Sequence, residues 1–145
     1  MIALIQRVSV ARVTVDGADV GSIGPGLLAF IAVQPDDTVA KATRLATRVL
    51  TYRVFSDTED RMNLSLLDEG LALLAVPQFT LAADTRKGTR ASFTRAAPPQ
   101  LGRELFDHFV VECRKQLAVV ETGQFGAHMK VSLDNDGPVT FWLEA

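Results

Sequence analysis

The sequence predicts an α+β fold, in which a mostly antiparallel sheet or small β-barrel carries two packed helices. Three observations support this class. Apolar residues alternate at both ends of the chain, two inner segments carry apolar stripes at helical spacing, and continuous apolar runs lie between them. The 145 residues contain no repeat and no linker. We therefore expect one domain, residues 1–145, in the usual size range of roughly 100–150 residues.

The first third of the chain is typical of strands. Residues 1–15 alternate in short apolar runs, which indicates a strand with one buried face. Asp16 and Gly17 follow, and this pair favours a tight hairpin because both residues tolerate positive φ. A return strand is expected over residues 18–23. Residues 27–33 form an unbroken apolar run, which predicts a buried strand.

Two helices are predicted. The first opens at residues 35–38, whose acidic and hydroxyl side chains suit the capping of free N–H groups. Its expected apolar face is Val39, Ala42, Leu45, Ala46, Val49 and Leu50. The second opens at Pro98 and Pro99, since proline is tolerated in a first helical turn. Its expected buried stripe is Leu101, Leu105, Phe109, Cys113 and Leu117.

The remaining elements are expected to be strands and loops. Residues 52–55 and 71–76 read as strands, and residues 82–97 are loop-like. The C-terminal part alternates over 129–133, turns at 135–137, and ends as a strand over 139–143.

Composition sets limits on function. The apolar fraction of 48% excludes a disordered chain, and 15 basic against 17 acidic residues argue against binding nucleic acid by bulk charge. No apolar run approaches the roughly 18 residues that a membrane span needs. The first seven residues place their charge after the apolar stretch, unlike a signal peptide, so a cytoplasmic location without membrane contact is expected.

The charge is distributed unevenly. Residues 84–115 hold seven basic and four acidic side chains, a net charge of +3. A solvated loop and helix face accounts for this stretch, and so does a local landing site for phosphates, in which Lys and Arg neutralise backbone charge. Both interpretations stay open.

Side chains suited to acid–base or metal chemistry are scarce. His108 and His128 lie in no acid–base motif, and each is expected to be structural. Cys113 is the lone cysteine, which excludes an internal disulfide, and its place on the apolar stripe predicts a packed core thiol. No metal-ligand spacing and no glycine-rich phosphate loop appears, so we expect neither metal nor cofactor.

Two segments stand out. Residues 76–81 run from a buried strand into polar groups, which suits a pocket that presents backbone N–H groups, an amide and a hydroxyl; an ordinary strand end is the alternative. Residues 134–140 contain Gly137 and Pro138 between two strands. An X-Pro bond in a tight turn is one of the few places where a cis peptide is inexpensive, at about 0.5–1 kcal/mol. A simple hairpin turn is the alternative there.

Together the two segments resemble the signature of the D-aminoacyl-tRNA deacylases, the D-Tyr-tRNA deacylase family. That family carries a Ser-Gln-Phe-Thr-Leu motif, matched by residues 77–81 (Pro-Gln-Phe-Thr-Leu), and an Asn-x-Gly-Pro-Val-Thr motif, matched by residues 135–140. The resemblance extends from the opening residues 1–8 to the closing Phe-Trp-Leu at 141–143. It implies a homodimeric hydrolase without cofactor that cleaves the ester between a D-amino acid and the 3′-terminal ribose of tRNA.

The resemblance also implies a gate against L-amino acids. In the family a Gly-cisPro peptide enters the active site of the partner subunit, and its carbonyls leave no room for an L side chain. Carried over, the gate is Gly137 and Pro138, with Arg7 holding its backbone. Glycine has no side chain to exclude, so Gly-tRNA is an expected second substrate.

The catalytic residues implied by the resemblance are Gln78, Phe79 and Thr80, with Pro77 and Met129 supporting the substrate. The backbone N–H of Phe79 is the expected oxyanion donor. The family is thought to let the substrate's own 2′-hydroxyl assist water, which fits the scarcity of acid–base side chains. Thr80 as a covalent nucleophile is the alternative, and its motif contains no base to take the proton.

Pro77 departs from the serine that is usual in the family. A related deacylase, which removes alanine from threonine tRNA, has Pro-Gln-Ala-Thr-Leu at this position and a trans Gly-Pro. The present chain shares that proline but keeps Phe79, Arg7 and Val139 of the D-specific pattern. The alternatives to a D-specific enzyme are this alanine-editing activity and a non-catalytic module that binds the tRNA end.

Overall fold

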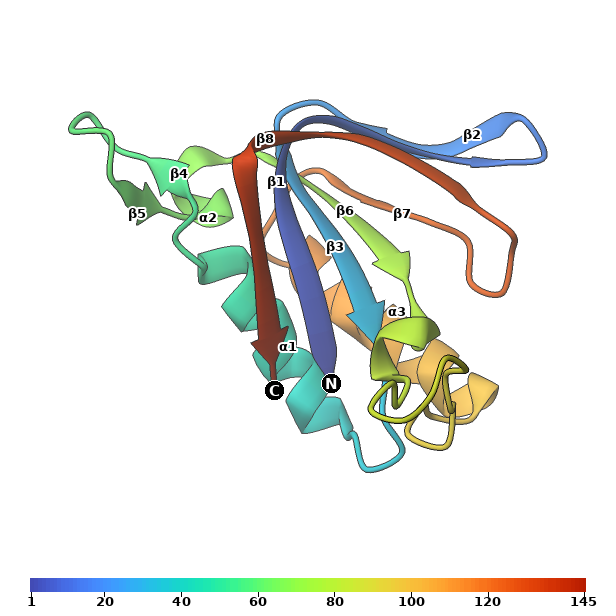
Figure 1. Cartoon of the computed structure of the whole chain (residues 1–145). Helices are drawn as coiled ribbons and strands as arrows, with labels where there is room; N and C mark the ends of the chain where they lie inside the picture. The colour runs from blue at the N-terminus through green and yellow to red at the C-terminus, as the bar shows by residue number, and fades with distance from the viewer.

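A six-stranded mixed sheet forms one layer of the protein, and two long helices cover one of its faces (Figure 1). This is a computed structural model that describes residues 1–145. Along the sheet the strands run β2 (Ala18–Ile23), β1 (Ile2–Val15), β3 (Gly26–Ala32), β6 (Ala72–Pro77) and β7 (Val120–Thr122), and β8 (Lys130–Glu144) also pairs with β1. A small hairpin of β4 (Phe55–Ser56) and β5 (Met62–Leu64) projects from one end.

Strand β1 organises the sheet because it is long enough to pair with three others. Its first half, from Ile2, lies between β3 and β8, and its second half, to Val15, lies between β2 and β8. The second half curls back over β3 and β6. At Gly21 on β2, an added Cβ atom would lie 2.5 Å from the carbonyl oxygen of Thr122 on β7, so glycine permits this close approach. The sheet is thus nearly closed.

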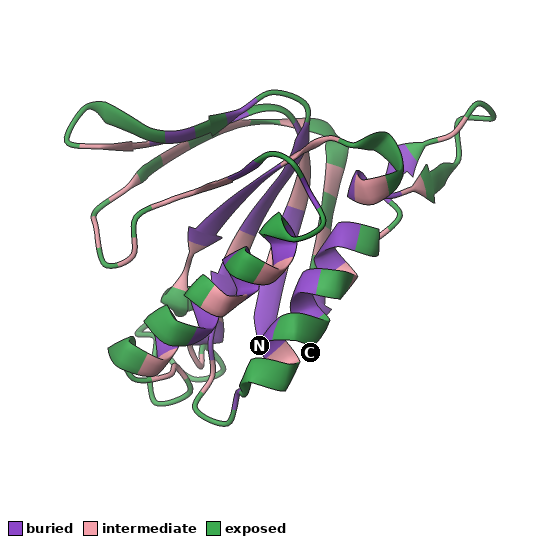
Figure 2. Ribbon diagram, turned by 180° about the vertical axis from the view of Figure 1, so that it is seen from behind, coloured by how far each residue is buried: buried purple, intermediate pink, exposed green.

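The main core lies between the sheet and the helices α1 (Val39–Thr51) and α3 (Pro99–Arg114), as the buried strands behind the helices in Figure 2 show. Thr38 caps α1 by accepting the N–H of Lys41, and Pro99 starts α3. Most residues of the two expected apolar stripes are buried, and Cys113 is fully buried. The prediction that Val39 belongs to the buried apolar face is wrong, because Val39 begins the helix and is 56% exposed.

A second, smaller core fills the space inside the curled sheet. Its buried members are Val8, Ala11, Val13, Ile23, Leu28, Leu74 and Val76. The expected α+β fold with two packed helices is therefore confirmed. The sheet is mixed, however, because β6 runs parallel to both β3 and β7. A third helix, α2 (Leu66–Glu69), and the 3₁₀ turn η1 (Phe79–Ala82) are too short for apolar periodicity to reveal. No helix has the length and apolar character needed to cross a membrane.

The predicted turn at residues 135–137 is wrong, since β8 is one continuous strand through this region. The ladder with β1 pairs Gln6 with Thr140 and then Val8 with Asn135. Four residues of β8 therefore stand opposite the single residue Arg7. We call these four, residues 136–139, the β8 bulge. The expected strand at 52–55 is likewise shorter, since Tyr52 ends α1 and the strand begins at Phe55.

Candidate active site

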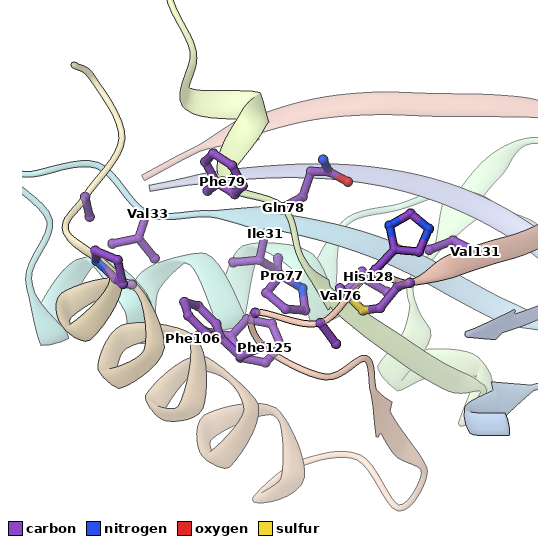
Figure 3. A pocket seen from close by; sticks show the side chains of 16 residues that line it. Ile31, Val33, Val76, Pro77, Gln78, Phe79, Phe106, Phe125, His128 and Val131 are labelled. Carbon is purple, nitrogen blue, oxygen red and sulfur yellow. The ribbon is translucent and has the colours of Figure 1, made fainter. Parts of the chain in front are cut away.

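A cavity of about 460 Å³ opens where β3 and β6 end, beside the first turns of α3 (Figure 3). The rings of Phe106 and Phe125 lie together on one side of it, and Gln78 and Phe79 lie on the opposite side. The full lining is Ile31, Val33, Val76, Pro77, Gln78, Phe79, Ala97, Pro99, Gly102, Phe106, Phe125, Gly126, Ala127, His128, Met129 and Val131. Most of these side chains are apolar, so the cavity suits an apolar or aromatic group.

The polar edge of the cavity is formed by the chain as it leaves β6. Gln78 keeps its backbone N–H paired with the carbonyl oxygen of Ile31, at 2.8 Å. The chain then tightens into η1. The backbone N–H of Phe79 donates to no acceptor in the chain, as is usual for the first N–H groups of a helical turn. The side-chain amide of Gln78 donates to the hydroxyl of Thr80.

The Phe79 side chain is 60% exposed and has one aromatic neighbour, Phe93, with the two ring centroids 5.2 Å apart. Phe93 follows a loop that is closed at its base, where Asp84 and Ser92 exchange two backbone hydrogen bonds. Arg86 within this loop binds Asp84 through two nitrogens and holds the pKa of that carboxyl well below its usual range. The loop of residues 84–92, which carries Arg86, Lys87 and Arg90, thus adjoins the rim of the cavity.

Met129 also lines the cavity. Its sulfur accepts the N–H of Gln124 at 3.3 Å and lies against Gly123, where an added Cβ atom would come within 2.8 Å of it. Met129 thus lies in the lining of the cavity, and its support of the substrate stays a prediction. No signal in the sequence indicated that Phe106 and Phe125 share this cavity, because both come from other elements.

His128 also lines the cavity, on the side of Val131 (Figure 3). It is the only titratable side chain of the lining. Sequence reasoning set it aside as structural, since it lies in no recognisable acid–base motif. His108, in contrast, lies on α3 away from the cavity, where its Nε2 atom forms a hydrogen bond of 2.8 Å with Thr43 of α1. No three side chains of His, Cys, Asp or Glu are grouped so that they could hold a metal ion.

Gly137 and Pro138 lie in the exposed β8 bulge, and the peptide bond between them is cis. The Nε atom of Arg7 donates to the carbonyl oxygen of Asp136 at 2.9 Å, and its Nη1 atom donates to that of Val54 at 2.6 Å. Residue 137 has φ of +145°, and a Cβ there would lie 2.7 Å from the Val139 side chain and 3.2 Å from Arg7. Glycine is the residue that this backbone accommodates.

The β8 bulge and the cavity are far apart in one chain. Arg7, opposite the bulge, is level with Leu27 on β3 and Leu73 on β6, and Pro77 at the cavity lies four residues further along β6. Strand geometry puts the two about 13 Å apart along the strands and about 14 Å across them, on the order of 20 Å in all. One chain therefore does not bring Gly137 and Pro138 to the residues of the cavity.

The chain resembles known proteins over its whole length. The family model described as D-Tyr-tRNA(Tyr) deacylase matches residues 4–144. A D-aminoacyl-tRNA deacylase of Thioalkalivibrio sulfidiphilus (strain HL-EbGR7) is 67% identical over 99% of this chain and 97% of its own length. One of Ralstonia nicotianae (strain ATCC BAA-1114 / GMI1000) is 60% identical over 99% and 90%.

Two solved structures share the fold. A c-Myc DNA unwinding element binding protein superimposes with a TM-score of 0.95 at 34% identity, covering 100% of this chain and 99% of its own. A probable eukaryotic D-amino acid tRNA deacylase has a TM-score of 0.89 at 18% identity, covering 99% and 98%. Given the full-length match to the family model and the high identity of these relatives, the chain belongs to the D-Tyr-tRNA(Tyr) deacylase family, a family of hydrolases that act on aminoacyl-tRNA.

Proposed function

We propose that this protein hydrolyses the ester bond of D-aminoacyl-tRNA, and that of Gly-tRNA as a second substrate, while it spares L-aminoacyl-tRNA. The observation that carries the proposal is the cavity at η1, where an unpaired backbone N–H lies beside an apolar space. The products are the free amino acid and tRNA. Family membership supports this reaction, and the geometry supports the roles of the individual residues given below.

The cavity suits the terminal adenosine of tRNA. Its volume of about 460 Å³ accepts a nucleoside, and the rings of Phe106 and Phe125 offer faces against which a base can pack. An adenosine held there would bring its ribose, and the ester on that ribose, to the polar edge formed by Gln78 and Phe79. The Lys and Arg side chains of the adjoining loop would then face the phosphates that precede the terminal nucleotide.

The chemistry proposed here relies on positioning. The N–H of Phe79 would stabilise the negative charge that develops on the carbonyl oxygen as water attacks. The neighbouring 2′-hydroxyl of the substrate would assist that water. Thr80 already accepts a hydrogen bond from Gln78 and has no titratable group bonded to it, so orientation of Gln78 fits it better than nucleophilic attack does.

Selection against L-amino acids requires a second copy of the chain. Gly137 and Pro138 lie on the order of 20 Å from Pro77 by strand spacing, so only a partner's bulge could reach the cavity. The sheet face opposite the helices is uncovered in this region and faces the viewer in Figure 1. Phe30, Leu4 and Trp142 form an apolar row across it, because Leu4 pairs with both of the others. We place the interface of a symmetric homodimer on this face.

Pro77 is the observation that favours a second candidate. The alanine-editing relative also has proline at this position of its motif, and Pro77 lines the cavity. Phe79 and the contact of Arg7 with the β8 bulge favour the D-specific reaction instead.

The test compares deacylation of D-Tyr-tRNA, L-Tyr-tRNA, Gly-tRNA and Ala-tRNA(Thr) by the purified protein. We expect hydrolysis of the D-Tyr and Gly substrates and none of L-Tyr-tRNA. Equal rates on both enantiomers would contradict chiral selection. Preferred hydrolysis of Ala-tRNA(Thr) would identify the alanine-editing activity, and binding without turnover would identify a non-catalytic module.

The gate is tested by Pro138→Ala. We expect this variant to hydrolyse L-Tyr-tRNA measurably while its unfolding midpoint in urea stays close to that of the parent protein. Unaltered discrimination in a folded Pro138→Ala protein would remove Gly137 and Pro138 from the proposal.

A further inference from the structure

The β8 bulge lacks the backbone ladder that holds the rest of β8. Pairing with β1 stops at Thr140, opposite Gln6, and resumes at Asn135, opposite Val8. Between these two residues the polar backbone groups of the bulge face a single residue of β1. In a regular strand those groups would be fixed by the neighbouring strand, so other contacts must set the conformation here.

Arg7 supplies such a contact at the start of the bulge, and the side chains of Asn135, Thr140 and Gln6 form a linked set of hydrogen bonds at its end. The Oδ1 atom of Asn135 accepts the N–H of Val139 at 2.8 Å, and its Nδ2 atom donates to the hydroxyl oxygen of Thr140 at 2.9 Å. The Nε2 atom of Gln6 donates to the same hydroxyl oxygen at 3.2 Å. Since a backbone N–H can only donate, the contact with Val139 requires Oδ1, and the amide of Asn135 then has one orientation that makes both bonds.

Together these hydrogen bonds link the two ends of the bulge. Asn135 precedes the bulge, Val139 is its last residue, and Thr140 follows it, so one amide joins both of its ends. Gln6 ties the hydroxyl of Thr140 to β1. The Arg7 side chain holds the first residue of the bulge, through the carbonyl oxygen of Asp136, and its other hydrogen bond goes to Val54 and not to the last residue of the bulge. Gly137 and Pro138 themselves are exposed, and Pro138 has no N–H to donate.

We propose that Gln6, Asn135 and Thr140 form a clamp that sets how strictly the enzyme rejects L-aminoacyl substrates. The three are positioning residues, and the proposal rests on the gate described under the proposed function. A gate that excludes a side chain by occupying its space depends on where its backbone atoms lie, and a displacement of about 1 Å is enough to weaken such a site. Arg7 alone fixes one end of the bulge, and the clamp fixes the other.

The decisive variant is Thr140→Val, which keeps the shape of the side chain and removes the oxygen that two donors share. We expect the ratio of D-Tyr-tRNA to L-Tyr-tRNA deacylation rates to fall at least tenfold, chiefly through a faster L reaction. Thr140→Ser restores the oxygen and should recover the ratio to within about twofold. Ser132→Ala, on β8 outside the bulge and without a side-chain hydrogen bond, is the matched control and should leave the ratio unchanged. An unchanged ratio in folded Thr140→Val protein would overturn the proposal.

Hydrogen–deuterium exchange provides a second measurement that needs no substrate. In the parent protein the Val139 amide is protected by Asn135, so peptides that cover residues 135–140 should exchange at least tenfold faster in Asn135→Ala and in Thr140→Val. Equal exchange in the parent and both variants would overturn the clamp. Should the parent protein show no preference for D over L substrate, the proposed function fails, and the exchange rates still decide whether the clamp exists.

Discussion

The guanidinium group of Arg7 donates from Nε to the carbonyl oxygen of Asp136 over 2.9 Å. The same side chain donates from Nη1 to the carbonyl oxygen of Val54, and it is only 16% exposed. Arg7 therefore joins the β8 bulge to the segment that leads into β4. Linking these two carbonyl oxygens, which belong to different parts of the chain, requires two donors in fixed positions, and the planar guanidinium group provides them.

Replacing Arg7 by lysine should weaken both the fold and the selection. A lysine ammonium is a single point on a flexible stem and cannot meet both carbonyls in this geometry. We expect the free energy of unfolding in urea to fall by about 1–3 kcal/mol, the cost of losing hydrogen bonds from a half-buried charged donor. The D/L ratio of deacylation rates should fall with it.

Arg12→Lys is the control for that experiment. Arg12 is 52% exposed and faces Asp19 at 3.7 Å, so its replacement should change the free energy of unfolding by less than about 0.5 kcal/mol. Equal changes in the free energy of unfolding for the two variants would show that the contacts of Arg7 with Val54 and Asp136 stabilise the fold no more than an exposed arginine does.

Neither Thr80 nor His128 is expected to perform the bond-making step. If the reaction relies on positioning, Thr80→Val and His128→Ala should each lower kcat by less than about tenfold, since general acid–base or nucleophilic roles are worth about a hundredfold or more. Single-turnover deacylation of D-Tyr-tRNA measures this.

A substrate whose terminal ribose lacks the 2′-hydroxyl provides the complementary test. It should react at least about a hundredfold more slowly with the parent protein, because the assisting group is then missing. Full activity on this substrate, together with a loss of about ten-thousandfold in Thr80→Val, would instead establish Thr80 as a nucleophile.

Leu4→Glu should dissociate the proposed dimer. The variant places a charge in the middle of the apolar row formed with Phe30 and Trp142, where an interface would have to desolvate it. Sedimentation velocity should report a monomer, and discrimination against L-Tyr-tRNA should be lost. Trp142 is the single tryptophan of the chain and is 49% exposed, so its emission should shift to the red on dissociation.

Val111→Glu is the matched substitution on the other side of the molecule. Val111 is 51% exposed on α3, away from the open sheet face, so the charge should leave the sedimentation coefficient unchanged. A monomeric parent protein that still discriminates between enantiomers would refute the trans gate.

The thiol of Cys113 should be chemically inert in the folded protein. Burial raises its pKa from 9.0 to about 12, because the apolar core disfavours the thiolate. A thiol-specific disulfide reagent at pH 8 should react with urea-unfolded protein and not with the native one. The folded state then holds the proton more tightly than the unfolded state, so the free energy of unfolding should decrease as the pH rises from about 9 to about 12.

Local patterns were sufficient for the elements that bury one face. The stripes through Leu45 and Phe109 predicted both helices because their spacing matches the helical period, and the run at 27–33 predicted a buried strand. The same reasoning failed at residues 135–137. Asn, Asp and Gly are usual in hairpin turns, and nothing in the local sequence shows that β1 continues to pair with the chain on both sides of the β8 bulge.

By itself, the sequence determined the fold class, the buried thiol and the two motifs that point to the deacylase family, because each is carried by residues that are neighbours along the chain. The tertiary structure decided which residues meet. Phe106, Phe125 and His128 join residues 77–79 at one cavity only because β6, α3 and the segment before β8 converge there. It also separated the two motifs, which lie on β8 and at the end of β6 with β1 and β3 between them. A distance between strands is set by pairing over the whole chain, and no local pattern records it.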